Sequence, residues 1–149
     1  MIVAIGICEI AGAVGSLFTV SQIPVWYSDL IKPPFNPPSW VFGPVWTTLY
    51  ILMGLSLFII WEKTDSPGSK KAILVFLLQL SLNSLWSLLF FGMHNPSLAF
   101  VEIVVLWLSI LWTIIEFKKI SKPAAWLLVP YLAWVTFASY LNLAVAILN

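Results

Sequence analysis

The sequence predicts an all-α membrane protein, a five-transmembrane-helix bundle with a proline-rich loop between its first two helices. Of its 149 residues, 61% are hydrophobic and only 9% are charged, whereas soluble domains carry about 25% charged residues. A spanning helix needs about 20 mostly apolar residues. Five segments meet this requirement and together form a single domain over residues 1–149: roughly 2–21, 40–61, 72–91, 97–117 and 124–147.

The first span carries a small residue at every fourth position: Ala4, Cys8, Gly12 and Ser16. Small side chains let membrane helices approach closely, either within one bundle or between subunits. Glu9 lies beside this stripe at membrane depth, where a carboxylate needs a partner or a neutralised state. The pattern predicts a tightly packed first helix, and it leaves the packing partner open.

A proline-rich stretch, residues 32–46, leads into the second span and holds five prolines and two tryptophans. Proline fixes φ and has no backbone N–H, so the two Pro-Pro pairs enforce an extended, non-helical passage. Ser39 follows as a predicted hydroxyl N-cap of the helix. An apolar chain does not need so rigid an approach merely to start a helix. We therefore predict a lid over the bundle, formed by Pro33, Pro34, Pro37, Pro38 and Trp40.

The later spans gather polar and aromatic residues on single faces, because positions three, four and seven apart share one side of a helix. Amides are costly in lipid, so those of the third span should point into the bundle. Pro130 predicts a bend near the start of the fifth span. The residues on these faces are Trp46, Tyr50 and Met53 in the second span, Gln79, Asn83, Trp86 and Phe90 in the third, Glu102 and Trp107 in the fourth, and Trp134, Ala138, Leu141 and Asn142 in the fifth.

Eight of the nine tryptophans in the chain fall into two groups. One group lies near the span ends, where indoles favour the membrane interface; these are Trp26, Trp40, Trp61 and Trp126. The other lies further along the helices and comprises Trp46, Trp86, Trp107 and Trp134. Large indoles beside amides suit a pocket for a flat, aromatic, weakly polar ligand. Ordinary aromatic packing between helices is the alternative.

The lysines predict the orientation of the chain in the membrane. Six of them fall in the two loops on the N-terminal side of the bundle, and only Lys32 falls on the other side. Because positively charged loops stay in the cytoplasm, we expect a cytoplasmic N-terminus and an outside C-terminus. The net charge of +1 gives no reason to expect a nucleic acid as a partner.

Residues for acid–base or metal chemistry are few. With one histidine, His94, and one cysteine, Cys8, neither a metal site nor a catalytic triad is predicted. Glu9 and Glu102 are the carboxylates at membrane depth. Such a pair could serve a proton-coupled transporter, although hydrogen-bonded structural glutamates are at least as common. Whether the protein is an enzyme stays open.

Three stretches resemble the signature of the TspO/MBR family, the tryptophan-rich sensory proteins, also known as translocator proteins or peripheral benzodiazepine receptors. The longest runs over residues 33–50 and reads PPFNPPSWVFGPVWTTLY. The others are QLSLNSLWS at residues 79–87, followed by FFG, and PYLAWVTFA at residues 130–138, followed by Leu141 and Asn142. The chain looks like a bacterial member of the family.

The resemblance implies an integral protein of the bacterial cell membrane, in contact with membrane lipid and commonly a homodimer. Its relatives bind porphyrins such as protoporphyrin IX or haem, and isoquinoline carboxamide or benzodiazepine drugs, in a pocket inside the bundle. Porphyrin is then a ligand, and no cofactor is required. With the helix faces above, the predicted ligand-binding residues are Trp46, Tyr50, Asn83, Trp86, Phe90, Trp107, Trp134, Ala138 and Leu141.

Two further activities remain open beside a receptor or sensor. Light- and oxygen-dependent porphyrin degradation would use Trp46 and Trp134 as its catalytic residues, and tetrapyrrole transport would move the pigment across the membrane. The cholesterol pattern of animal members is missing, because Leu143 occupies its tyrosine position and no basic residue follows. Cholesterol binding is therefore not expected.

Overall fold

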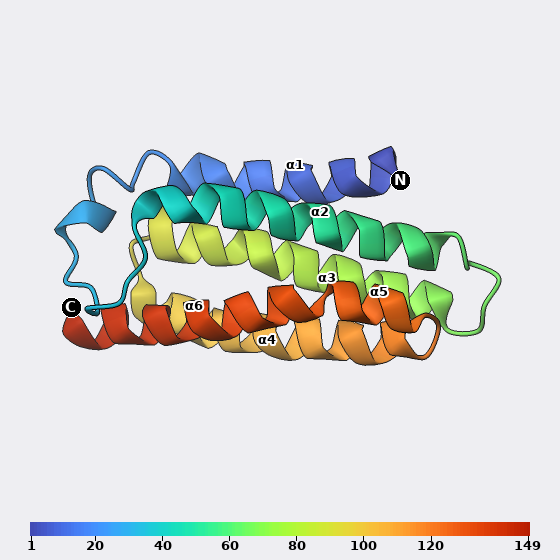
Figure 1. The fold of residues 1–149 in the computed structure, drawn as a ribbon. Coiled ribbons are helices and arrows are strands. Elements are labelled where there is room, and N and C mark those ends of the chain that lie inside the picture. The colour runs from blue at the N-terminus through green and yellow to red at the C-terminus, as the bar shows by residue number, and fades with distance from the viewer.

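A computed structural model describes residues 1–149, which form helices and connecting loops without any strand (Figure 1). The α-helices are α1 (Ile2–Thr19), α2 (Phe42–Trp61), α3 (Ser69–Ser87), α4 (Pro96–Lys118), α5 (Lys122–Leu127) and α6 (Val129–Leu148). Five helical segments are long and apolar enough to cross a membrane, the fifth combining α5 and α6. The predicted all-α, five-span fold is confirmed.

Two predicted boundaries need correction. The first helix ends at Thr19, and the second begins with one 3-10 turn, Ser39–Val41, before α2. The predicted N-cap at Ser39 is wrong, since Val41 occupies the N-cap of α2 and makes no side-chain capping bond. Ser39 already lies inside a helical turn, so its hydroxyl does not sit where a cap must sit.

The third and fifth spans are irregular at one end each. After α3 the chain widens into a π-helical turn, Leu88–Gly92. The fifth span breaks at Leu128, between α5 and α6. Pro130 has no N–H to donate to the carbonyl four residues earlier, which accounts for the predicted bend.

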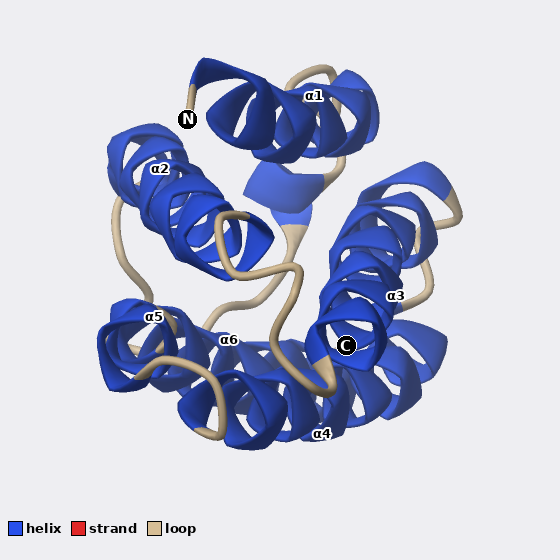
Figure 2. Ribbon diagram, turned by 90° about the vertical axis from the view of Figure 1, so that its right-hand side faces the viewer, coloured by secondary structure: helices blue, strands red, loops and turns tan.

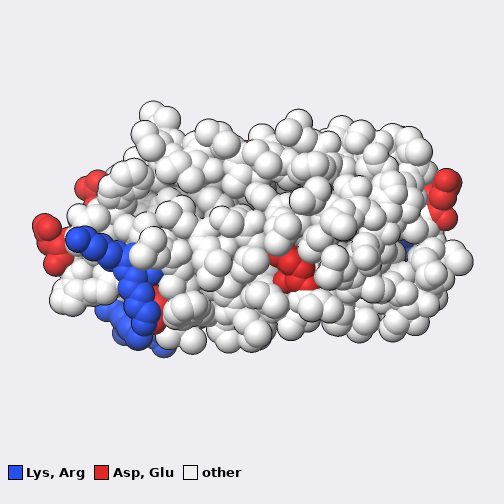
Figure 3. Space-filling view, turned by 180° about the vertical axis from the view of Figure 1, so that it is seen from behind, with Lys and Arg blue, Asp and Glu red and all other residues white.

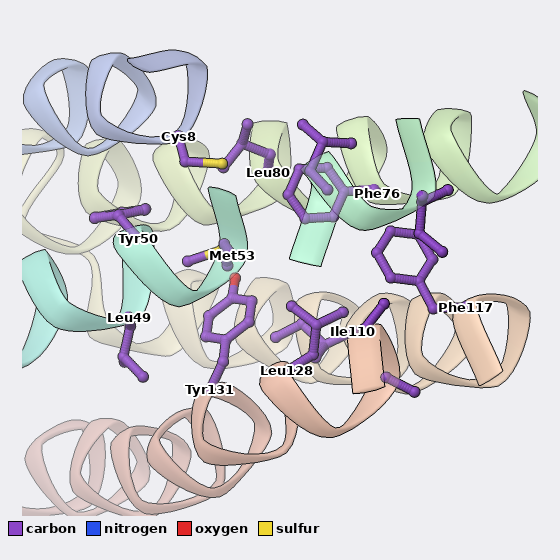
Figure 4. Close-up of a cluster of buried hydrophobic side chains, with 14 of the residues drawn as sticks. Cys8, Leu49, Tyr50, Met53, Phe76, Leu80, Ile110, Phe117, Leu128 and Tyr131 are labelled. Carbon is purple, nitrogen blue, oxygen red and sulfur yellow. The ribbon is translucent and has the colours of Figure 1, made fainter. Parts of the chain in front are cut away.

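Viewed along its axis, the bundle is a ring of helices in the order α1, α2, α5 with α6, α4 and α3 (Figure 2). Its hydrophobic core fills the half that holds α5. Phe76 and Phe117 stack there with ring centroids 5.8 Å apart, and both are fully buried. Figure 4 shows this core together with Met53 and Tyr131.

The small-residue stripe of α1 packs within the bundle. Ala4 and Cys8 are buried in the core, and Gly12 lies directly against the ring of Tyr50. On α2, Gly54 lies against the backbone of Ile5. Neither glycine position has room for a Cβ atom, so close contact between α1 and α2 depends on both.

The two ends of the bundle differ in charge. The N-terminus lies at the same end as the α2–α3 and α4–α5 loops, and the C-terminus lies at the other (Figure 1). Lysines gather at the N-terminal end (Figure 3), where Glu116 forms ion pairs with Lys71 at 3.5 Å and Lys119 at 3.1 Å. The structure thus places the six lysines of the two loops at one end, as the sequence predicts.

Candidate functional site

A cavity of about 520 Å³ opens between the helices in the half of the bundle that carries the C-terminus. Its walls come from α1, α2, α3, the π-helical turn and α6, and the α1–α2 loop covers its mouth. Eight of the nine predicted ligand-binding residues line it: Trp46, Tyr50, Asn83, Trp86, Phe90, Trp134, Ala138 and Leu141. Motifs far apart in the sequence therefore meet at one cavity.

Trp107 does not line the cavity. It lies on α4, which contributes no residue to the walls. Its indole Nε1 donates a hydrogen bond to Thr136 Oγ1 of α6 at 2.8 Å, so the side chain joins two helices. The sequence predicts Trp107 in the pocket, but the structure places it outside the cavity. Helical spacing locates a residue along its own helix, but not the neighbour that its face meets.

The floor of the cavity is a buried chain of hydrogen bonds. Tyr50 donates to Asn83 Oδ1 at 2.8 Å, and Asn83 Nδ2 donates to the Tyr131 hydroxyl at 2.7 Å. Tyr131 in turn donates to Gln79 Oε1 at 2.8 Å. These bonds tie α2, α3 and α6 together, and Gln79 Nε2 completes the set with a contact of 3.9 Å to Met53 Sδ. Both amide side chains are buried, which confirms that Gln79 and Asn83 point inward.

Tyr131 is a site residue that the sequence reasoning missed. It is fully buried behind the cavity wall and links Asn83 to Gln79, and its ring packs edge-on against Trp46 at 6.3 Å. A signal was available, since a buried tyrosine hydroxyl needs a partner and the amides of the third span are natural ones.

A second polar contact fixes one aromatic wall. Trp86 donates from Nε1 to Asn142 Oδ1 at 2.9 Å, and Asn142 Nδ2 donates to the Pro96 carbonyl at 2.7 Å. Trp86 also stacks on Phe90, with ring centroids 5.1 Å apart. The Trp86 ring is thus held in one orientation by an amide on one side and an aromatic ring on the other.

The π-helical turn places two consecutive aromatic residues at the cavity. Phe90 and Phe91 are both buried, lie 4.8 Å apart between centroids, and both line the walls. A π-turn takes an extra residue per turn and so changes the side-chain register of the helix. Adjacent residues, which a regular helix separates by about 100°, can then reach the same space.

The loop before α2 covers the mouth with Tyr27, Asn36, Ser39 and Trp40. Asn36 Nδ2 donates to the Tyr27 hydroxyl at 3.1 Å, and Lys32 Nζ lies 4.7 Å from the centre of the Tyr27 ring. Burial raises the pKa of the Tyr27 phenol, so this hydroxyl stays protonated at neutral pH. The mouth is therefore covered by a polar, hydrogen-bonded segment.

The prolines of the predicted lid lie apart from the cavity walls. Pro33 and Pro34 line a shallow outer groove against α6 instead, where Phe35 and Tyr140 have ring centroids 5.4 Å apart. The loop is also anchored to the C-terminus, because Asn149 Nδ2 donates to the Ile31 carbonyl at 2.9 Å. Of the five predicted lid residues, only Trp40 contacts the cavity, and it is 75% exposed.

The two glutamates at membrane depth and the single histidine lie in different places relative to the cavity. Glu9 lines the cavity, whereas Glu102 is buried on α4 and neither of its carboxylate oxygens has a hydrogen-bond partner. His94 lies outside the cavity on the α3–α4 turn, and no three His, Cys, Asp or Glu side chains gather closely enough to hold a metal ion.

These features define a class: a helical membrane protein with a cavity lined by aromatic residues between its helices. The chain belongs to the TspO/MBR family, whose sequence profile matches residues 4–148. It is 47% identical over 150 residues to the tryptophan-rich protein TspO of Chlorobaculum tepidum, covering 97% of this chain and 92% of the relative. The TspO protein of Archaeoglobus fulgidus is 46% identical, with coverages of 93% and 89%. The sheep translocator protein is 41% identical, with coverages of 78% and 70%.

Proposed function

We propose that this integral membrane protein is a receptor or sensor that binds a porphyrin, such as protoporphyrin IX or haem, in the cavity between its helices. Isoquinoline carboxamide and benzodiazepine-type drugs would occupy the same space. The observation that carries the proposal is the lining itself, with Trp46, Trp86 and Trp134 around about 520 Å³. Aromatic walls of this kind favour flat, largely apolar ligands, because stacked rings bury a large apolar area.

Two indole N–H donors on the cavity walls have no hydrogen-bond partner within the protein. The Trp86 indole N–H is already bonded to Asn142, but Trp46 and Trp134 make no hydrogen bond within the protein and line the same cavity. An indole donor without a partner can orient the carbonyl or ring nitrogen of a ligand. Two free donors in an apolar cavity would fix the orientation of a ligand that the apolar walls bind.

Porphyrin titration tests this assignment. Trp46→Phe removes an aromatic wall and a donor, and Asn83→Ala removes the centre of the floor. We expect either to weaken protoporphyrin IX binding about tenfold, the equivalent of about 1.4 kcal/mol, as measured by quenching in lipid nanodiscs. Trp107→Phe is the matched control, because this tryptophan lies outside the cavity. If all three variants bind as the wild type does, the cavity is not the porphyrin site.

A second candidate is light- and oxygen-dependent porphyrin degradation. It is favoured by the position of Trp46 and Trp134, which both line the cavity and would lie beside a bound photosensitiser. Illuminating the complex in air should then bleach the porphyrin and oxidise these indoles. If Trp46→Phe/Trp134→Phe bleaches porphyrin at the wild-type rate, the two tryptophans take no part in the reaction.

We also propose that the lysine-rich end faces the bacterial cytoplasm, which puts the mouth of the cavity on the outer side. Single cysteines can test this in intact cells, with Cys8 buried and therefore shielded. Asp65→Cys, in the lysine-rich α2–α3 loop, should resist a membrane-impermeant thiol reagent, and His94→Cys should react. The reverse labelling pattern would invert the orientation.

A further inference from the structure

The cavity has a single charged wall residue. Among the residues that line it there is no lysine, arginine, histidine or aspartate, and the one carboxylate is that of Glu9. Glu9 lies about midway along α1 and makes neither an ion pair nor a side-chain hydrogen bond. Its side chain is partly exposed, and this exposure includes the cavity. A carboxyl group without a countercharge therefore lies in an otherwise neutral, aromatic space at membrane depth.

A charge on this group is costly to keep without compensation, because the bilayer interior solvates ions poorly. The other glutamate at membrane depth, Glu102, is enclosed by protein and cannot meet a ligand in the cavity. Glu9 differs because a bound molecule can reach it. The opposite walls are aromatic, and the faces of Trp, Tyr and Phe rings attract organic cations.

We infer that Glu9 makes the cavity charge-selective, with a subsite for the protonated or quaternary amine of a lipophilic aromatic ligand. The carboxylate supplies the counter-charge, and the faces of the aromatic rings contact the cation and the apolar body of the ligand. This inference rests on the proposed function, because it assumes that the cavity is the ligand site. It adds that a porphyrin must enter with its carboxylates turned toward the mouth, away from Glu9.

Three probes that share a naphthylmethyl body can separate charge from apolar contact, and the first two of them also share one shape. These are (naphthylmethyl)trimethylammonium, its uncharged analogue with carbon in place of nitrogen, and naphthylacetate. Binding is measured calorimetrically with the full chain in nanodiscs, and empty nanodiscs are subtracted. Glu9→Gln keeps the shape and removes the charge, Glu9→Asp keeps the charge, and Glu102→Gln removes the other membrane-depth charge outside the cavity.

We expect the wild type to bind the ammonium probe about tenfold more tightly than the uncharged analogue, since partly buried charge pairs contribute on this scale. Glu9→Gln should abolish that preference and should also tighten binding of naphthylacetate and protoporphyrin IX. Glu9→Asp should retain part of the preference, and Glu102→Gln should retain all of it.

The outcomes that overturn the inference are distinct from those that overturn the proposed function. If the probes and porphyrin bind but Glu9→Gln changes all affinities equally, or none, then Glu9 does not select by charge and only this inference fails. If no probe and no porphyrin binds the wild type, the cavity is not a ligand site and both fail. If the preference vanishes in Glu102→Gln but persists in Glu9→Gln, then Glu102 and not Glu9 selects by charge, and the inference fails.

Discussion

Trp26 and His94 stack face to face, with ring centroids 4.4 Å apart and ring planes 9° apart. His94 Nε2 also lies 2.9 Å from Gln22 Oε1. The backbone of His94 is left-handed, with φ of 51°, an uncommon conformation outside glycine that is retained only where the surroundings favour it. This contact joins the loop over the cavity mouth to the turn between α3 and α4.

Removing the histidine ring should therefore loosen the mouth without dismantling the bundle. In His94→Ala we expect both the association and the dissociation rates of a porphyrin to rise severalfold, with a smaller change in affinity. Stopped-flow quenching measures the rates, and faster amide exchange over residues 20–31 would locate the effect. His94→Phe preserves a stacking ring and should stay close to the wild type. Equal rates in His94→Ala and the wild type would show that the stack does not control access.

The proline pairs of the same loop should affect ligand kinetics before helix content. Replacing Pro33, Pro34, Pro37 and Pro38 with alanine relaxes an extended segment and raises the entropy of the unfolded chain, at about 0.4–1 kcal/mol per site. We expect faster ligand exchange with unchanged far-ultraviolet circular dichroism. Pro67→Ala, in the loop at the opposite end, is the control. Loss of helix content in the fourfold variant would show that the prolines stabilise the fold instead.

A methyl group at Gly54 should separate α1 from α2. The added Cβ would collide with the backbone of Ile5, which cannot rotate away as a side chain can. Overpacking of this kind typically costs about 1–3 kcal/mol. We expect Gly54→Ala to lower the unfolding temperature in detergent. Gly6→Ala, on α1, meets no atom within 4 Å and should not lower the unfolding temperature, because alanine is the better helix former. Equal unfolding temperatures of the two variants would contradict close packing at Gly54.

Loss of one hydroxyl should destabilise the cavity floor. Tyr131→Phe leaves Asn83 Nδ2 and Gln79 Oε1 without their partner in a buried environment, which costs about 1–3 kcal/mol per unsatisfied group. We expect a lower unfolding temperature and weaker porphyrin binding. Tyr140→Phe removes a hydroxyl from an exposed residue and should change neither. If Tyr131→Phe is as stable as the wild type, water or another group satisfies both amides.

Most of the fold and much of the cavity lining can be predicted from the sequence. Apolar segments of about 20 residues locate the five spans, and amides that lipid cannot satisfy must face inward, as Gln79 and Asn83 do. Eight of the nine residues that the motifs and helix faces predict for the site line the cavity, because one helix face commonly lines one space. The small-residue stripe indicates close packing, and the structure supplies the missing partner, α2.

What the sequence does not reveal depends on contacts between helices. Trp107 is a tryptophan at the same membrane depth as those of the cavity, but it lies on α4, which contributes no residue to the cavity walls. Helical spacing alone does not report which helices face the cavity. The π-helical turn at Leu88–Gly92 has no signature in a run of apolar residues. The sequence indicates that Glu9 needs a partner or a neutralised state, but only the structure places it on the cavity wall.

The packed core in the half of the bundle that holds α5 bears on tetrapyrrole transport. Ile60, Phe76, Ile110 and Phe117 are fully buried in the half below the hydrogen-bonded floor, and the cavity walls include none of them. The cavity is therefore closed by packed side chains at the end next to this core. If a tetrapyrrole binds in the cavity as proposed, it would leave through the opening by which it entered, and passage to the other side would have to follow the outside of the protein, along the lipid.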